Sequence, residues 1–245
     1  MSLNPVLIFG STGGIGMAIT KTLLENNAHV CAVHHHPDGR LRLEKEMQSE
    51  RISFHRMDLS NEESVAGEMA HICKEYQHIP AVVFSVSAPI VNKPILRSTW
   101  DDYATHINIQ MKALVAIISA MKEQIQSGKK IRFVIVLSDV CIGAPPSGMS
   151  AYTAAKYALM GLAKSMAVEF SQYGCTVTMV SPGMVDTDLI SNFPPKLVEL
   201  TAQKNPLKRI ATPQDVANVV CFLLGEGGEY LNGANIPVNG GGNMA

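Results

Sequence analysis

Tyr152 and Lys156 are the residues of this chain whose types and spacing point most directly to chemistry. They stand four positions apart in the segment SAYTAAK, a spacing that places both side chains on one face of a helix. A free tyrosine has a pKa of about 10, and a fixed positive charge beside it favours phenolate and lowers that pKa. A general acid or base works best with a pKa near the operating pH. The pair therefore predicts a group that passes a proton to or from an alcohol oxygen.

A second chemical signal is the glycine-rich segment from Gly10 to Gly16, which reads GSTGGIG between an apolar run and a helical stretch. Glycines permit a tight turn and let the backbone approach a pyrophosphate closely. The N-terminus of the helix that follows offers free N–H groups and a positive dipole end to phosphate. The segment predicts a cradle for the phosphates of a dinucleotide.

These residues must be positioned by elements that alternate along the chain. Short, β-branched apolar runs are separated by longer helical stretches, a pattern that predicts βαβ units. We expect an α/β fold: a single Rossmann-type, doubly wound domain over residues 1–245, with a seven-stranded parallel sheet and helices on both faces. The expected strands are Val6–Phe9, His29–His34, Ile52–Arg56, Ala81–Val86, Ile131–Leu137, Thr176–Val180 and Ala234–Val238, and the expected helices include Gly14–Asn26, Glu62–Tyr76, Asp101–Gln126, Tyr152–Tyr173 and Pro213–Leu224.

The least regular stretch covers about residues 186–206 and is rich in proline. It follows an expected strand, and open α/β sheets bind ligands beyond the carboxyl ends of their strands. We expect a lid on the substrate side, with a plain surface loop and a short helix as the alternative.

Composition and charge narrow the function classes. The 245 residues are 47% hydrophobic and 17% charged, with a formal net charge of −1. Such a chain can bury a large core and gives no electrostatic reason to bind nucleic acid or an anionic membrane. The five cysteines have no CxxC spacing, the apolar runs are too short to span a bilayer, and residues 1–5 lack a basic signal-peptide region. We expect a cytoplasmic protein.

The glycine segment and the Tyr152–Lys156 pair, about 140 residues apart, together resemble the short-chain dehydrogenase/reductase family. The resemblance extends through nearly the whole chain and is greatest to 3-oxoacyl-[acyl-carrier-protein] reductases and similar ketoreductases. Asn108 resembles the family's active-site asparagine, and Asp58-Leu59 resembles the acidic segment that caps the adenine of the cofactor. Residues 181–187 resemble the Pro-Gly segment that holds the nicotinamide amide. Residues 206–217 and 231–241 resemble the family's last helix and strand.

The resemblance implies hydride transfer between a nicotinamide and a carbon that bears oxygen, with the protein handling the proton. It implies that Tyr152 donates the proton, that Lys156 lowers the tyrosine pKa and binds the nicotinamide ribose, and that Asn108 holds a water that relays protons. It also implies a homo-oligomer, a tetramer or a dimer. The cofactor-binding residues expected by resemblance are Gly10, Ser11, Thr12, Gly14, Ile15, Gly16, His34, Asp58, Leu59, Ala88, Tyr152, Lys156, Pro182, Gly183, Val185 and Thr187.

Two stretches depart from the family pattern. The family's active-site serine normally lies thirteen residues before the tyrosine, where this chain has Asp139, while Ser138 lies fourteen before. Either the proline-rich loop that follows carries one extra residue and Ser138 fills the role, which we favour, or Asp139 replaces the serine. An ionised Asp139 would repel a developing oxyanion, whereas a protonated one could still donate. The family's Asn-Asn-Ala-Gly is Val-Ser-Ala-Pro at residues 86–89, where only Ala88 is kept.

Cofactor choice depends on the end of the second expected strand, where an acid binds the ribose hydroxyls of NAD and basic residues accept the phosphate of NADP. No acid stands directly at that end; His34, His35 and His36 are followed by Arg40 and Arg42, so we expect NADP in preference to NAD. Adjacent residues of an extended run point in alternating directions, so we expect no metal at the three histidines.

The sequence thus favours an NAD(P)-dependent oxidoreductase that reduces a ketone or oxidises a secondary alcohol, with a small-molecule or carrier-linked carbonyl substrate such as a 3-oxoacyl thioester. One alternative is a catalytically impaired NADP-binding sensor or assembly subunit of the same fold, motivated by the departures at Asp139 and Val86. Another is a reductase of a sugar or of a different carrier-linked intermediate.

Overall fold

One parallel sheet organises the molecule. The computed structural model describes residues 5–244. Residues 1–4 and 245 of the expected domain lie outside this range, and so does most of the 1–5 segment in which we expect no signal peptide. Within it, seven strands pair in the order β3-β2-β1-β4-β5-β6-β7, which confirms the expected doubly wound fold. The strands are β1 (Val6–Phe9), β2 (Val30–His34), β3 (Ile52–Arg56), β4 (Ala81–Phe84), β5 (Arg132–Val136), β6 (Thr176–Pro182) and β7 (Asn235–Val238).

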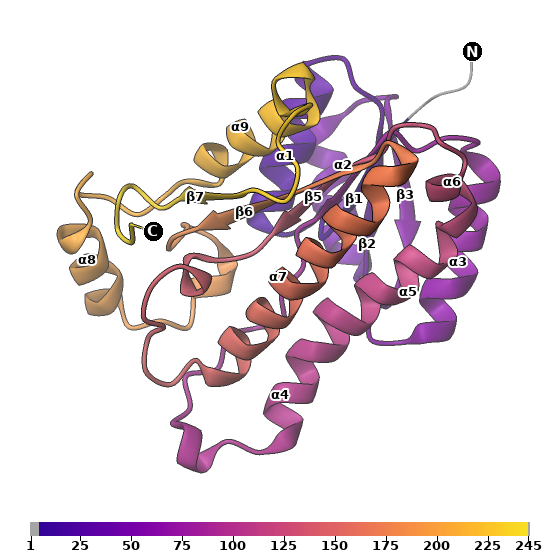
Figure 1. The fold of residues 1–245 in the computed structure, drawn as a ribbon. Helices are drawn as coiled ribbons and strands as arrows, with labels where there is room; N and C mark the ends of the chain where they lie inside the picture. Colours follow the sequence, from indigo (N-terminus) through magenta and orange to yellow (C-terminus); the bar gives the residue numbers. More distant parts are fainter. Residues whose placement is uncertain (1–4, 245) are drawn as a thin grey trace.

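Helices cover the sheet on both faces (Figure 1). Helices α1 and α9 pack on each other over one face, with α2 beside them, whereas α3, α5 and α7 cover the other face. The helices are α1 (Gly14–Glu25), α2 (Pro37–Met47), α3 (Glu62–Glu75), α4 (Trp100–Ile107), α5 (Ala113–Ala120), α6 (Lys122–Gln126), α7 (Ser150–Phe170), α8 (Pro195–Lys204) and α9 (Pro213–Leu224).

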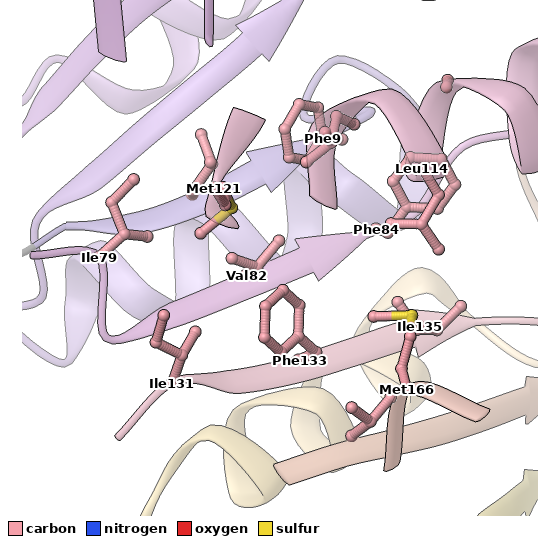
Figure 2. Packing of buried hydrophobic residues seen from close by; sticks show 14 of the residues in the cluster. Phe9, Ile79, Val82, Phe84, Leu114, Met121, Ile131, Phe133, Ile135 and Met166 are labelled. Carbon is pink, nitrogen blue, oxygen red and sulfur yellow. The ribbon is translucent and has the colours of Figure 1, made fainter. Parts of the chain in front are cut away.

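Two apolar cores result from the alternation of side chains along each strand. In β1, Leu7 and Phe9 belong to the core beneath α3, α5 and α7, while Val6 and Ile8 belong to the core beneath α1 and α9. Figure 2 shows Phe9, Phe84 and Phe133 in the first core. Because both faces of the central sheet are buried, β1 and β4 are apolar throughout, as buried parallel strands usually are.

Two local features differ from the expected elements. The single helix expected over Asp101–Gln126 is divided into α4, a π-helical turn (Asn108–Lys112), α5 and α6. Helix α2 was not among the expected helices, because it is mostly polar and buries only Leu43. The stretch of residues 186–206 contains a short 3₁₀ turn (Asp188–Ile190) and α8, the short helix that the alternative expectation gave it.

No helix within residues 5–244 combines the length and the apolar composition needed to cross a membrane.

Candidate active site

The loop between β1 and α1 has a backbone that only glycine fits. Gly10 has a φ of +80°, and a Cβ there would overlap the carbonyl oxygen of Ser85; a Cβ on Gly16 would overlap the carbonyl oxygen of Gly10. Gly13 precedes α1 without a side-chain cap among the described residues, so the first N–H groups of the helix remain available to an anion. The loop therefore fits the phosphates of a dinucleotide.

The other residues of this cradle shape it rather than line it with side chains. Buried Ser11 donates a hydrogen bond of 2.7 Å from Oγ to the carbonyl of Val33. Thr12 lies against Gly39 at the start of α2, and Ile15 packs on the core beneath α1. The structure thus brings the predicted residues together around one loop.

The segment that begins at Pro182-Gly183 reaches the same loop from the end of β6. Pro182 ends β6, and Gly183 donates a backbone hydrogen bond of 3.1 Å to Val238. Val185 is buried, and the methyl group of Thr187 lies directly over Gly14. A cleft of about 800 Å³ opens beside this contact, between α1, α2 and residues 186–198.

The end of β2 carries a buried histidine. His34 Nδ1 has no hydrogen-bond partner among the described residues, and burial lowers the pKa of His34. Asp58 bonds both the backbone N–H and the hydroxyl of Ser60, which lowers its pKa. Half-buried Leu59 packs against the core beneath α3. This end of the site therefore presents a neutral imidazole and a carboxylate already held in a turn.

Basic side chains lie beyond β2, each beside an acid. Arg40 bonds Glu44 at 2.8 Å and lies over the Phe54 ring, while Arg42 lies 3.3 Å from Asp188. All of these pairs are solvent-exposed, where ion pairs contribute little. The arginines can therefore exchange their partners for a phosphate at small cost.

Tyr152 and Lys156 lie together on the inner face of α7. Tyr152 is 6% exposed and Lys156 is 2% exposed, and the lysine Nζ lies 5.8 Å from the centre of the tyrosine ring. Lys156 Nζ donates hydrogen bonds to the carbonyls of Val136 at 3.0 Å and Val86 at 3.4 Å. These two carbonyls, at the ends of β5 and β4, fix the ammonium beneath the tyrosine.

The protonation of this pair is controlled by burial. Burial raises the pKa of Tyr152 to about 12 and lowers the pKa of Lys156 to about 8, because a low-dielectric environment disfavours the charged form of each group. The expected lowering of the tyrosine pKa is therefore wrong for this arrangement. Burial thus favours the neutral phenol of Tyr152 and weakens the hold of Lys156 on its proton.

Ser138 and Asp139 follow β5 and face different ways. Ser138 Oγ accepts a hydrogen bond of 3.4 Å from the backbone N–H of Val140, and its hydroxyl lies near enough to Tyr152 to oppose the rise in the tyrosine pKa. Asp139 Oδ2 instead accepts a hydrogen bond of 3.0 Å from Asn243 in the C-terminal segment, and burial raises the pKa of Asp139. The aspartate carboxylate is thus held by the C-terminal segment, whereas the serine lies near Tyr152.

An apolar wall surrounds Tyr152. Ile90, Met149 and Tyr152 form a buried cluster with Val140 and Cys141. Leu189 and Phe193, from the stretch expected to form a lid, pack against this cluster. Ala88, two positions before Ile90, is also buried. The stretch that holds Leu189 and Phe193 therefore lies beside the tyrosine, where a lid on the substrate side would have to be.

A family model described as enoyl-(acyl carrier protein) reductase matches residues 10–243, which include the cradle, the Tyr152–Lys156 pair and the Pro-Gly segment. The chain belongs to this family of short-chain dehydrogenases/reductases. It is therefore an oxidoreductase.

Relatives within this short-chain dehydrogenase/reductase family match along almost their whole length. The chain is 28% identical over 239 residues to the 3-oxoacyl-[acyl-carrier-protein] reductase FabG of Pseudomonas aeruginosa, covering 96% of this chain and 95% of that protein. It is 28% identical to the 3-oxoacyl-[acyl-carrier-protein] reductase MabA of Mycobacterium tuberculosis, covering 96% and 91%. Among solved structures, a dehydrogenase/reductase from Sinorhizobium meliloti 1021 is 25% identical with a TM-score of 0.88, covering 99% and 97%. A structure of ElxO with NADP bound has the same fold, at 24% identity and a TM-score of 0.88, covering 98% of each chain.

The asparagine expected from the family pattern is not at the pair. Asn108 is exposed, whereas His106 and Gln110, two positions to either side, are buried. His106 stacks edge-on against Tyr152 with ring centres 5.8 Å apart, and Gln110 Nε2 lies 3.4 Å from His106 Nδ1. Positions 106 and 110 share one helix face and position 108 lies on another. Two polar residues spaced i, i+4, at His106 and Gln110, were the sequence signal for this helix face.

Proposed function

We propose that the protein is an NADP(H)-dependent ketoreductase that reduces a 3-oxoacyl thioester or a similar ketone with an apolar chain. The observation that carries this proposal is the buried Tyr152 side chain, which lies near Ser138 and clusters with Ile90 and Met149, with Phe193 packed against that cluster. Such a cluster suits an acyl chain, and the two hydroxyls suit a carbonyl oxygen. The names of the FabG and MabA relatives support the same substrate class.

In the proposed reaction a bound nicotinamide cofactor supplies the hydride. The backbone around Gly10 and Gly16 and the free N–H groups of α1 hold its phosphates. Tyr152 Oη donates a proton to the substrate oxygen, and the Ser138 hydroxyl donates a hydrogen bond to the same oxygen as negative charge develops on it. Asp139 is held away by Asn243, so no carboxylate faces the oxyanion.

Lys156 has the proposed task of stabilising the tyrosine after proton transfer. A phenolate below an ammonium is favoured by charge, and a lysine with a pKa of about 8 can release and regain a proton near neutral pH. His106 and Gln110 lie beside the pair, and Gln110 Oε1 is buried with no partner among residues 5–244. We assign these two side chains, in place of Asn108, to holding the polar contacts behind Tyr152.

The preference for NADP rests on the residues beyond β2. His34 replaces the acid that would bind the ribose hydroxyls of NAD, and Arg40 and Arg42 are exposed nearby. The ElxO structure is described with NADP bound, whereas a 3-ketoacyl-(acyl-carrier-protein) reductase structure from Brucella melitensis is described with NADH. The proposed preference for NADP over NAD therefore rests on the residues of this chain and not on its relatives.

The assembly and the compartment belong to the same proposal. Trp100, Val115, Tyr157 and Val168 are exposed apolar residues on α4, α5 and α7, and an apolar helix face of this kind favours a homo-oligomer, either a dimer or a tetramer. The cysteines are free in the described chain, which supports a reducing compartment such as the cytoplasm.

The deciding experiment titrates the protein with NADPH and NADH, then follows cofactor oxidation with ketones, 3-oxoacyl thioesters and 2-enoyl thioesters. The proposal predicts tighter binding of NADPH and turnover of 3-oxoacyl thioesters. Tight NADPH binding without turnover of any substrate would favour the non-catalytic alternative. Turnover of enoyl thioesters alone would replace carbonyl reduction by reduction of a carbon–carbon double bond.

A further inference from the structure

A cluster of His55, His71 and Glu75 lies between the edge strand β3 and helix α3, outside the active site. His55 comes from β3, and His71 and Glu75 stand four positions apart on α3, where they share one face. One ligand atom from each of the three residues lies within 4.8 Å of the other two. Two imidazoles and one carboxylate are a ligand set used by zinc.

His55 shows the orientation of a metal-binding histidine. Its side chain is 6% exposed, and its Nδ1 lies 2.8 Å from Oε1 of Glu68. Because a carboxylate only accepts hydrogen bonds, Nδ1 carries the proton and donates it. A carboxylate on one ring nitrogen is the outer contact that fixes the other nitrogen for a metal.

The second nitrogen of His55 has no hydrogen-bond partner in the described chain, although it is buried. The nearest acid oxygen, Oε2 of Glu75, lies 3.6 Å from His55 Nε2 and 3.7 Å from His71 Nε2. Both distances exceed the 2.7–3.2 Å range of a direct N–H···O bond. Zinc bonds of about 2.0–2.1 Å in a tetrahedron hold neighbouring ligand atoms roughly 3.4 Å apart, close to what is observed.

We propose that His55, His71 and Glu75 bind one zinc ion, with Glu68 orienting His55 and water at the fourth position. His71 is 64% exposed and Glu75 is 39% exposed, which gives the ion an entry path and leaves room for the water. The ion joins an edge strand, which has a strand partner on one side only, to the helix that covers it. Its role is therefore to stabilise the β3–α3 unit, because a ligand that binds only the folded state stabilises that state.

The test uses the full chain without a histidine tag, treated with a chelator and titrated with zinc chloride by calorimetry and thermal unfolding. We expect one zinc per chain. At free zinc about 100-fold above Kd, we expect Tm to rise by roughly 5 to 10 °C. Both effects should be lost in His71→Gln and Glu75→Gln, which change exposed side chains and leave the fold intact.

Two further variants make the outcome specific. Glu68→Gln, which removes the outer carboxylate, should weaken zinc binding by about 10- to 100-fold. His36→Gln, an exposed histidine outside the cluster, should bind zinc as the wild type does. The proposal is overturned if the wild type binds no zinc, if His71→Gln binds it equally well, or if His36→Gln loses it to the same extent. Activity is not the readout, so the result is independent of the proposed function.

Discussion

In the cradle between β1 and α1 the residues that fit a ligand are also those that the fold requires, whereas around Tyr152 the groups suited to chemistry are a burden on the fold. Gly10 and Gly16 pack backbone on backbone, with no buried charge. Lys156 is a buried cation, and Gln110 carries a buried oxygen without a partner among the described residues. Substitutions in the cradle should therefore lower both stability and cofactor binding, whereas substitutions in the pocket around Tyr152 should lower activity but raise stability.

Lys156→Met gives the largest expected effect on stability, and its sign distinguishes the two regions. A pKa lowered from 10.5 to about 8 corresponds to a cost on the order of 3 kcal/mol for holding the charged lysine at pH 7. The carbonyls of Val86 and Val136 lose a donor, so we expect the net free energy of unfolding to rise by about 2 kcal/mol. Chemical denaturation measures this change, with turnover lost.

The pH dependence of Lys156→Met checks its cause. A depressed lysine pKa means that the unfolded state binds more protons between about pH 8 and 10.5, so wild-type stability rises with pH through that window. The advantage of the variant should be complete below pH 8 and shrink as the pH approaches 10.5. A variant less stable than the wild type at pH 7 would contradict the comparison.

Gly16→Ala tests the other region. A Cβ at this position would overlap the Gly10 carbonyl oxygen, so we expect a loss of about 1–3 kcal/mol in stability and weaker binding of NADPH in the same variant. Gly161→Ala is the matched control, because a Cβ there meets nothing within 4 Å and a helix favours alanine. Thermal unfolding and a fluorescence titration report the two effects; weakened binding with unchanged stability would break the link between fold and ligand.

Gln110→Met separates the buried helix face from the exposed one. Methionine fills similar space without the unpartnered oxygen, so we expect stability to hold or to rise by about 1 kcal/mol while kcat falls roughly tenfold. Asn108→Met, on the exposed side, should change stability by less than about 0.5 kcal/mol and leave kcat unchanged. If steady-state kinetics show the fall in kcat in Asn108→Met instead, Asn108 has the role that the family pattern predicted for it and Gln110 does not.

Arg40→Gln carries the smallest expected effect, because exposed charges interact weakly. The variant loses one charged contact to the ribose phosphate that NADPH has and NADH lacks. NADPH binding should weaken by roughly tenfold, about 1.4 kcal/mol, with NADH binding unaffected. Lys45→Gln, an exposed cation further along α2, serves as the control. Equal weakening of both cofactors in Arg40→Gln would remove this residue from the choice between them.

The two regions also differ in how far the sequence predicted them. The cradle depends on a local run of glycines, so its place between β1 and α1 followed from spacing, and the seven strands followed from apolar runs. The pocket depends on helix phase and on distant packing. A motif match selected Asn108, but the buried face carries His106 and Gln110, and the π-helical turn that begins at Asn108 interrupts the expected helix.

The tyrosine pKa shows the same limit. Charge proximity along α7 predicted a lowered value, but burial in a cluster that includes Ile90, about 60 residues earlier in the chain, raises it. Whether Ser138 or Asp139 faces Tyr152 likewise depends on Asn243, more than 100 residues away, whose side chain holds the aspartate. No local motif around Asp139 contains this contact.

Single-turnover reduction by Tyr152→Phe with bound NADPH tests most directly whether Tyr152 gives a proton to the substrate. Phenylalanine keeps the ring against His106 and removes only the hydroxyl, so NADPH affinity should be preserved while the rate of cofactor oxidation falls by about 10²- to 10⁴-fold. Tyr157→Phe, an exposed tyrosine on the same helix, should react as the wild type does. A Tyr152→Phe variant that reduces substrate at the wild-type rate would contradict the account.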